Sequence, residues 1–262
     1  AFLASLFLCS FQPQFVYIRH AKNTTMNFSL TEEHLMIRKA ARDFANSVCK
    51  PGVIERDSDQ IWPAEQVKGM AELGFLGMMV DPKYGGSGLD TLSYVIALEE
   101  ISKIDNSSSV LMSVNNSLVC WGLQEFGTEE QKQKYLTPLA KGEKLGAFCL
   151  SEPEAGSDAT SQRTTAVDKG DHYILNGTKN WITNGGCASI YLVIAQTDPS
   201  KGSKGIDVLI VEKGMEGFIV GKKEDKLGIR SSDTHTLLFN DVKVPKANRI
   251  GEEGFGFKFA MK

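Results

Sequence analysis

The sequence predicts an α+β protein, in which an all-helical N-terminal domain is followed by a mainly antiparallel β-barrel or β-sandwich domain. Apolar residues recur at helical spacing from Leu30 to about Gly142, and the period changes to two from Lys144 onward. The two patterns do not alternate, which is typical of α+β proteins and not of parallel βαβ units. We therefore expect a helical domain over residues 26–144 and a β domain over residues 145–254.

The helical half begins at Thr31, which lies between two leucines at the spacing of a hydrophobic staple, and Pro51 ends the first predicted helix. Gly74 stands where a C′ glycine would follow the second helix. A capping-box pattern at residues 128–131 begins the last one. The Gly-rich segment 84–88 is interpreted as a structural turn, because no phosphate-binding pattern follows it. The predicted helices cover residues 31–50, 63–73, 90–104, 109–126 and 128–141.

In the second half, Asn176-Gly177 predicts a β-hairpin, because both residues tolerate the positive φ of a type I′ turn. In the strand that follows, alternation places Trp181 and Thr183 on one face and Ile182 on the other. Residues 198–202 have the composition of a turn. The predicted strands cover residues 146–150, 172–175, 180–183, 190–196, 206–212, 234–239 and 241–244.

Composition limits the kinds of partner. With 262 residues, 42% of them hydrophobic and 23% charged, the chain is an ordinary globular protein, and its net charge of -3 argues against a nucleic-acid partner. Five scattered cysteines favour a reducing compartment over a disulfide framework, and no histidine pair has metal-ligand spacing. The apolar run from Ala1 to Leu8 is too short to span a bilayer. We interpret residues 1–25, which contain no acidic residue, as an extension outside the fold, with a targeting segment as the alternative.

The run from Phe148 to Asp158 and the run from Asn176 to Asn184 together predict a flavin seat. The first is a short apolar strand that ends at Pro153 and leads into a loop of small and hydroxyl residues, whose backbone N–H groups can turn toward a diphosphate. The second carries an indole beside hydroxyl donors, which suit a flat heteroaromatic ring with acceptor nitrogens. A lone tryptophan on a sheet is ordinarily a core residue, but the combined pattern favours a ligand.

These two runs resemble the signature of the acyl-CoA dehydrogenase family, and the similarity extends over nearly everything after Met26. Three further segments resemble the family's next blocks in the same order, and the first of them is most similar to the short-chain, butyryl-CoA branch. They are residues 222–230, 242–245 and 251–258. The resemblance implies that residues 255–262 begin a C-terminal helical domain whose catalytic glutamate lies beyond Lys262. We therefore expect no catalytic base in this chain.

The resemblance implies that FAD is the cofactor. Ser151 would reach the pyrimidine end of the isoalloxazine, and Ser157 would lie near a diphosphate and bind the acyl-CoA substrate. Trp181 would pack on the flavin, and Thr183 would form a hydrogen bond near its N5 atom. No metal ligand is expected. The expected flavin-binding residues are Phe148, Cys149, Leu150, Ser151, Gly156, Ser157, Trp181, Ile182 and Thr183.

Other charged residues have ordinary interpretations. Consecutive carboxylates at Glu99 and Glu100 point in different directions on a helix, so we interpret them as a solvated face and not as an acid/base pair. Glu152 and Glu154 would repel a neighbouring diphosphate unless they point away, which favours a role in turn geometry or in a subunit contact. The lysines of residues 222–226 are interpreted as a solvated edge, with contact to the CoA phosphates as the alternative.

The resemblance implies α,β-dehydrogenation of a fatty acyl-CoA thioester, short-chain by subfamily, to the trans-2-enoyl-CoA, with electrons passed to an electron-transfer flavoprotein. Such proton abstraction requires preorganised donors that stabilise enolate charge at the thioester oxygen. The chain alone is expected to be inactive. An acyl-CoA oxidase and a non-redox acyl- or lipid-binding module are the alternatives. For the complete protein we expect a homotetramer in the bacterial cytoplasm, with the mitochondrial matrix as the alternative compartment.

Overall fold

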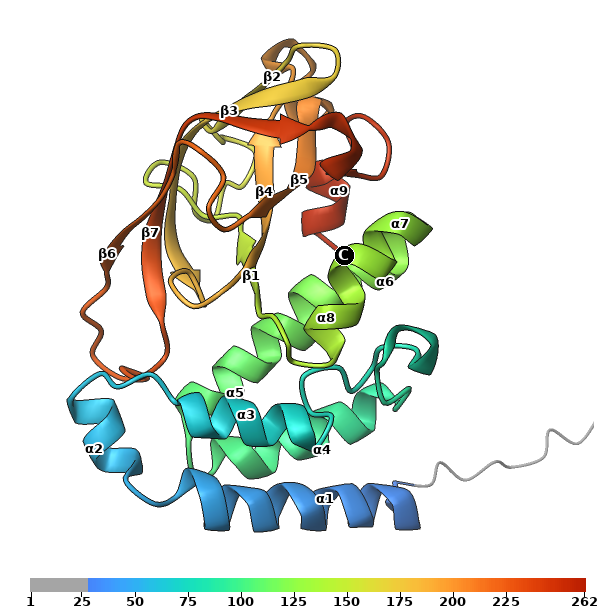
Figure 1. Ribbon diagram of the computed structural model, residues 1–262, viewed down its shortest axis with the longest axis vertical. Helices are drawn as coiled ribbons and strands as arrows, with labels where there is room; N and C mark the ends of the chain where they lie inside the picture. Colours follow the sequence, from blue (N-terminus) through green and yellow to red (C-terminus); the bar gives the residue numbers. More distant parts are fainter. Residues whose placement is uncertain (1–27) are drawn as a thin grey trace, which may run out of the picture. The chain divides into compact units, whose positions relative to one another are not determined.

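The structure, a computed structural model, describes residues 28–262, and helices occupy the first half of that range (Figure 1). The predicted extension over residues 1–25 lies outside the described residues. Three π-helical segments continue the α-helices: η1 (Ala45–Cys49) extends α1, η3 (Val114–Cys120) joins α5 to α6, and η4 (Lys132–Leu136) joins α7 to α8. The α-helices of this half are α1 (Glu32–Phe44), α2 (Val53–Ser58), α3 (Ala64–Glu72), α4 (Thr91–Ser102), α5 (Asn106–Ser113), α6 (Trp121–Phe126), α7 (Glu129–Gln131) and α8 (Thr137–Ala140).

Capping residues fix where the predicted helices begin. The Thr31 hydroxyl accepts a hydrogen bond from the His34 amide at 3.2 Å, and the His34 ring accepts one from the Thr31 amide at 3.3 Å, so α1 starts with a capping box. The predicted capping box at the start of α7 is also present. Two details differ from the prediction. Helix α2 was not expected, because its six residues include none that is buried, and α5 begins before residue 109 because Asp105 caps it.

The second half forms one eight-stranded, mostly antiparallel sheet, as the fold class predicts. The strand order is β6-β7-β3-β2-β4-β5-β8, and β1 pairs with β4 in parallel. Strands β2, β6 and β8 are absent from the sequence-based prediction. The strands are β1 (Gly146–Cys149), β2 (Thr165–Asp168), β3 (His172–Thr183), β4 (Ile190–Gln196), β5 (Ile206–Glu212), β6 (Phe218–Lys223), β7 (Thr234–Pro245) and β8 (Arg249–Ile250), and α9 (Gly256–Ala260) follows them.

The predicted hairpin at Asn176-Gly177 is wrong. Strand β3 runs unbroken through both residues, and its pairing with β7 shifts register between Leu175 and Gly177. The Asn176 side chain donates to Asp241 Oδ1 at 2.9 Å and accepts from the Asp241 amide at 2.8 Å, so it bridges to the neighbouring strand and does not close a turn. Asn176 lies opposite two residues of β7, Asn240 and Asp241, so the bulge belongs to β7, while Gly177, at φ 147°, packs closely against Thr164.

One apolar core joins the helices to the sheet. Residues 31–262 form a single compact unit, and Gln131 of α7 donates to the carbonyls of Ala247 and Arg249 at 2.8 and 2.9 Å. A second core lies among β1, β3, β4, β5 and β7. No helix within residues 28–262 is both long enough and apolar enough to cross a membrane. The core shared by helices and strands includes Val119, Leu123, Tyr135, Leu136, Leu139, Ile190, Leu192, Ile194, Val208 and Ile210.

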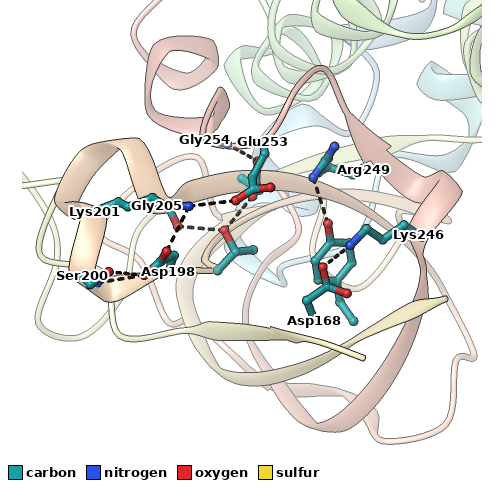
Figure 2. Close-up of polar contacts among 12 residues, drawn as sticks. Asp168, Asp198, Ser200, Lys201, Gly205, Lys246, Arg249, Glu253 and Gly254 are labelled. Carbon is teal, nitrogen blue, oxygen red and sulfur yellow. Dashed lines mark hydrogen bonds and ion pairs between the residues drawn. The ribbon is translucent and has the colours of Figure 1, made fainter. Parts of the chain in front are cut away.

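Charged groups tie the segment before α9 to the loop that contains η5 (Pro199–Gly205) (Figure 2). Lys201 Nζ lies 3.1 Å from Asp198 Oδ2 and 3.1 Å from Glu253 Oε1. The Gly254 amide donates to Asp207 Oδ1 at 2.8 Å, so the position at which α9 begins is fixed by β5. Figure 2 also shows the ion pair of Lys246 with Asp168 and the hydrogen bond that Arg249 donates to the Tyr173 hydroxyl.

Candidate functional site

The fold brings the two predicted runs into direct contact. The Asn180 amide of β3 donates to the Ser151 carbonyl at 2.9 Å, so the loop that follows β1 lies against the residue that precedes Trp181. Cys149 and Ile182 are both buried in the second core, whereas Trp181 is 59% exposed. This burial agrees with the predicted alternation of Trp181 and Ile182.

Trp181 has an unusual backbone. Its φ is 58°, in the left-handed region that bulky residues rarely adopt, and it lies at a register shift between Lys179 and Ile182. The two residues that bound the register shift are buried, with Lys179 0% and Ile182 2% exposed. Because such strain persists only where the surroundings impose it, and because it concentrates at functional sites, Trp181 is the strongest structural candidate for ligand contact.

The loop that carries Gly156 and Ser157 is anchored by Glu152. The Glu152 side chain is 2% exposed, accepts from the Arg163 amide at 2.6 Å and the Thr164 amide at 3.2 Å, and lies 2.7 Å from Lys179 Nζ. Burial opposes ionisation of this carboxyl, but the Lys179 charge and the hydrogen bonds outweigh burial and lower its pKa. The structure therefore places Glu152 in turn geometry, one of the two predicted roles.

Lys179 is a residue that the sequence analysis missed. Its ammonium group is fully buried, and burial lowers its pKa in spite of the neighbouring Glu152 charge. The alternation along β3 could have predicted that Lys179 is buried, because Tyr173, Leu175 and Lys179 occupy alternate positions on the buried side of this strand. A lysine at such a position requires buried acceptors.

The end of β3 is also fixed by side chains. Thr183 pairs with Thr234 across the β3–β7 ladder, and Asn184, which follows at φ 63°, donates to the Gly146 carbonyl at 3.0 Å. Asp233 accepts the Cys187 amide at 2.7 Å and contacts His235 Nε2 at 2.8 Å. The strand that presents Trp181 and Thr183 is therefore held at its C-terminal end.

The other expected flavin residues differ in what they expose. Gly156 and Ser157 are exposed, whereas Leu150, Ser151 and Thr183 are half-buried. The Cys149 and Ile182 side chains face the core, so only their backbone could meet a ligand, and burial raises the pKa of the Cys149 thiol. Phe148 stacks on Phe259 of α9 with a centroid distance of 6.3 Å, beside a cavity of about 210 Å³ that both line.

The interpretation of Glu100 as part of a solvated face is wrong. Glu100 is 4% exposed and receives hydrogen bonds from Arg42 Nε at 2.9 Å and Lys103 Nζ at 2.9 Å. The hydrogen bond from Arg42 and the charge of Lys103 outweigh burial and hold the pKa of Glu100 at about 2. Glu99 does lie on the exposed side.

Two of the three lysines of residues 222–226 bind the protein itself, whereas Lys222 is exposed. Lys223 Nζ donates to the Gln60 carbonyl at 2.8 Å, and Lys226 Nζ donates to the Ser232 carbonyl at 2.8 Å. The first bond joins β6 to the segment after α2, at the lower end of the long β6–β7 pair in Figure 1. These contacts favour a structural role over the predicted solvated edge.

Fold and site together define an α+β protein whose helices precede a mostly antiparallel sheet, with an exposed indole beside an anchored loop. Family models of the acyl-CoA dehydrogenase N-terminal domain and middle domain match residues 31–143 and 147–242. The chain belongs to the acyl-CoA dehydrogenase family.

Curated relatives are similar over most of this chain. It is 51% identical over 237 residues to the short-chain specific acyl-CoA dehydrogenase of Clostridium acetobutylicum, covering 90% of this chain and 62% of the relative. It is 48% identical over 233 residues to the mitochondrial short-chain specific acyl-CoA dehydrogenase of Homo sapiens, covering 89% and 57%. The chain thus spans about three fifths of the length of these relatives.

Solved structures agree. Butyryl-CoA dehydrogenase from Megasphaera elsdenii matches with a TM-score of 0.88 at 49% identity, covering 90% of this chain and 63% of that one. A structure described as the electron transferring flavoprotein of Acidaminococcus fermentans matches with a TM-score of 0.88 at 52% identity, covering 90% and 62%. The FAD complex of PigA matches with a TM-score of 0.85 at 32% identity, covering 89% and 62%.

Proposed function

We propose that this chain forms the N-terminal and middle domains of a FAD-dependent acyl-CoA dehydrogenase that acts on short-chain thioesters. The observation that carries the proposal is the contact between Ser151 and Asn180, which sets an anchored loop beside the strained and exposed Trp181. The family membership and the names of the short-chain relatives support the substrate class.

The residues present fit FAD. The exposed loop with Gly156 and Ser157 offers backbone N–H groups and a hydroxyl to a diphosphate, while Trp181 offers an indole face and Thr183 a hydroxyl to a flat ring. The cofactor, when bound, supplies the acceptor for the hydride that leaves the substrate β-carbon. Cys149 and Ile182 would contribute through their backbone only, because their side chains are buried.

The base that removes the α-proton is proposed to lie beyond Lys262. Within residues 28–262 the two carboxylates considered from sequence are poor candidates, because Glu100 is neutralised by Arg42 and Lys103 and Glu99 is an exposed partner of Lys103. What this chain contributes to the chemistry is therefore orientation of the cofactor and exclusion of water from its inner face.

The partners follow from the same proposal. We propose that electrons pass to an electron-transfer flavoprotein, in line with the similar structure described under that name. A homotetramer is proposed for the complete protein. The bacterial cytoplasm is the proposed compartment, with the mitochondrial matrix as the alternative, because the short-chain relatives include proteins of both origins.

Titration of the protein with FAD tests the proposed flavin-binding site. We expect protein-bound FAD, and replacement of Trp181 by leucine should raise the dissociation constant about tenfold, the magnitude of one aromatic stacking contact. Replacement of Trp62 by phenylalanine, in the helical part, is the matched control and should leave the constant unchanged. A wild-type protein that never retains FAD would contradict the proposal and favour the non-redox acyl-binding module.

The identity of the electron acceptor distinguishes an acyl-CoA dehydrogenase from an acyl-CoA oxidase. The product of the complete gene, reduced with butyryl-CoA, should be reoxidised rapidly by electron-transfer flavoprotein and slowly by dissolved oxygen. Rapid oxygen consumption on addition of butyryl-CoA would identify an oxidase instead.

A further inference from the structure

The ammonium group of Lys179 has three acceptors, two of which belong to buried side chains. Its Nζ atom lies 2.7 Å from Glu152 Oε1, 2.9 Å from Gln162 Oε1 and 3.0 Å from the Leu150 carbonyl oxygen. A lysine has three N–H donors, so each donor has a partner. The side chain is 0% exposed, and Glu152 and Gln162 are 2% and 7% exposed.

These acceptors come from the two ends of one loop. Leu150 and Glu152 precede the mostly exposed residues 153–161, in which Ala155 and Ala159 are buried, and Gln162 follows them. Glu152 also accepts the amides of Arg163 and Thr164, so the outgoing end of the loop is bound to the incoming end. Lys179 fastens both ends to β3.

The same lysine lies at the start of the strained segment of β3. Register with β7 is regular from Gly177 to Lys179 and resumes at Ile182, so Asn180 and Trp181 form a second irregular part of the ladder. The Asn180 amide is bound by the Ser151 carbonyl, within the loop base that Lys179 holds. Any movement of the Lys179 side chain would therefore change the loop and the Trp181 backbone together.

We propose that Lys179 is a positioning residue for the flavin seat, which holds the loop of residues 151–164 and the left-handed Trp181 in one fixed arrangement through Glu152 and Gln162. The inference rests on the proposed function. Stability alone does not account for the arrangement, because a buried ion pair is often no more stabilising than apolar residues of the same volume, whereas its hydrogen-bond geometry specifies one conformation.

The test compares Lys179→Met with the double variant Lys179→Met/Glu152→Gln, which removes both charges and leaves no unpaired buried carboxylate. Amide hydrogen exchange should rise about tenfold in residues 153–163 of both variants, while residues 206–212 of β5 keep wild-type protection. The FAD dissociation constant should also rise about tenfold in the double variant, although its thermal midpoint returns toward the wild-type value. The double variant Arg42→Met/Glu100→Gln, which removes an ion pair of the helical part, is the control and should leave both readouts unchanged.

The outcomes separate the inference from the proposed function. If the wild-type protein binds FAD and Lys179→Met/Glu152→Gln binds it equally well, or if exchange in residues 153–163 does not change, the inference is overturned and the proposed function stands. If the wild-type protein binds no FAD, the proposed function fails, and Lys179 has no flavin seat to position. A loosened loop together with weakened FAD binding supports both.

Discussion

The Asn180 amide and the Ser151 carbonyl, 2.9 Å apart, connect two segments that are separated by the whole of β2 and most of β3. This hydrogen bond is possible because β3 leaves its regular ladder with β7 just before Trp181, which frees the Asn180 amide. The proposed flavin-binding site therefore depends on a local departure from regular strand geometry.

The left-handed backbone of Trp181 predicts that glycine is more stable than alanine at this position, the reverse of the usual order in a strand. At φ 58° a Cβ atom costs roughly 1–2 kcal/mol, so Trp181→Gly should be more stable than Trp181→Ala by about 1 kcal/mol, as measured by urea unfolding. Ile174, a half-buried residue of the same strand that is not among the positive-φ residues, provides the control. There the glycine variant should be less stable than the alanine variant by roughly 0.5–1 kcal/mol. The same order of stability at both positions would show that Trp181 is not strained.

The close approach of Gly177 to Thr164 predicts a strong destabilisation by one added methyl group. A Cβ atom there would lie 2.6 Å from Thr164 Cα, and φ is 147°, so Gly177→Ala should destabilise the protein by about 2–3 kcal/mol and shift the start of β2. Thermal unfolding measures the loss. Gly228, which has no atom within 4 Å of an added Cβ, is the matched control, and Gly228→Ala should change stability by less than about 0.5 kcal/mol. Equal effects at the two glycines would contradict this account of the packing between Gly177 and Thr164.

Asn176-Gly177 also shows why sequence predicts some features and not others. Helix caps such as Thr31 depend on neighbouring residues only, and they were predicted correctly. The same dipeptide that closes a hairpin can lie inside a strand opposite a bulge of the neighbouring strand, and which of the two occurs depends on Asp241, 65 residues away. Ion pairs such as Lys179 with Glu152 join positions 27 residues apart, so spacing alone could not pair them. Of the candidate site, the sequence predicted which segments meet but not the strain at Trp181 that shapes their contact.

The buried carboxylate of Glu100 predicts a pH-dependent stability. Its pKa of about 2 lies below the ordinary value of 4.5, so its contribution is fully present above about pH 4.5 and disappears as the pH falls toward 2. Glu100→Gln should therefore cost about 2 kcal/mol at pH 7, the magnitude of charged hydrogen bonds, and much less near pH 2.5. Urea unfolding across this pH range gives the difference from wild type.

Glu99 supplies the control for Glu100, because it precedes Glu100 on α4 and shares Lys103 as a partner, yet its side chain is 54% exposed. Exposed pairs contribute little, so Glu99→Gln should cost at most about 0.5 kcal/mol at every pH. A cost for Glu100→Gln that stays constant from pH 7 to pH 2.5 would show that the carboxylate charge is not what stabilises this position.

The hydrogen bonds of Gln131 predict how much this side chain contributes to the attachment of the helices to the sheet. Its Oε1 accepts from the Thr128 amide at 3.1 Å, while Nε2 donates to the carbonyls of Ala247 and Arg249, and the side chain is buried. Gln131→Glu keeps the volume and the cap but turns a carboxylate oxygen toward two carbonyls, which should cost about 3 kcal/mol at pH 7. The cost relative to wild type should shrink at pH 4, because a protonated carboxyl can donate to one carbonyl again. Glu130→Gln, an exposed change on the same helix, is the control and should show neither effect. A cost for Gln131→Glu that does not change with pH would mean that lost packing weakens the attachment, and not the replacement of a donor by an acceptor.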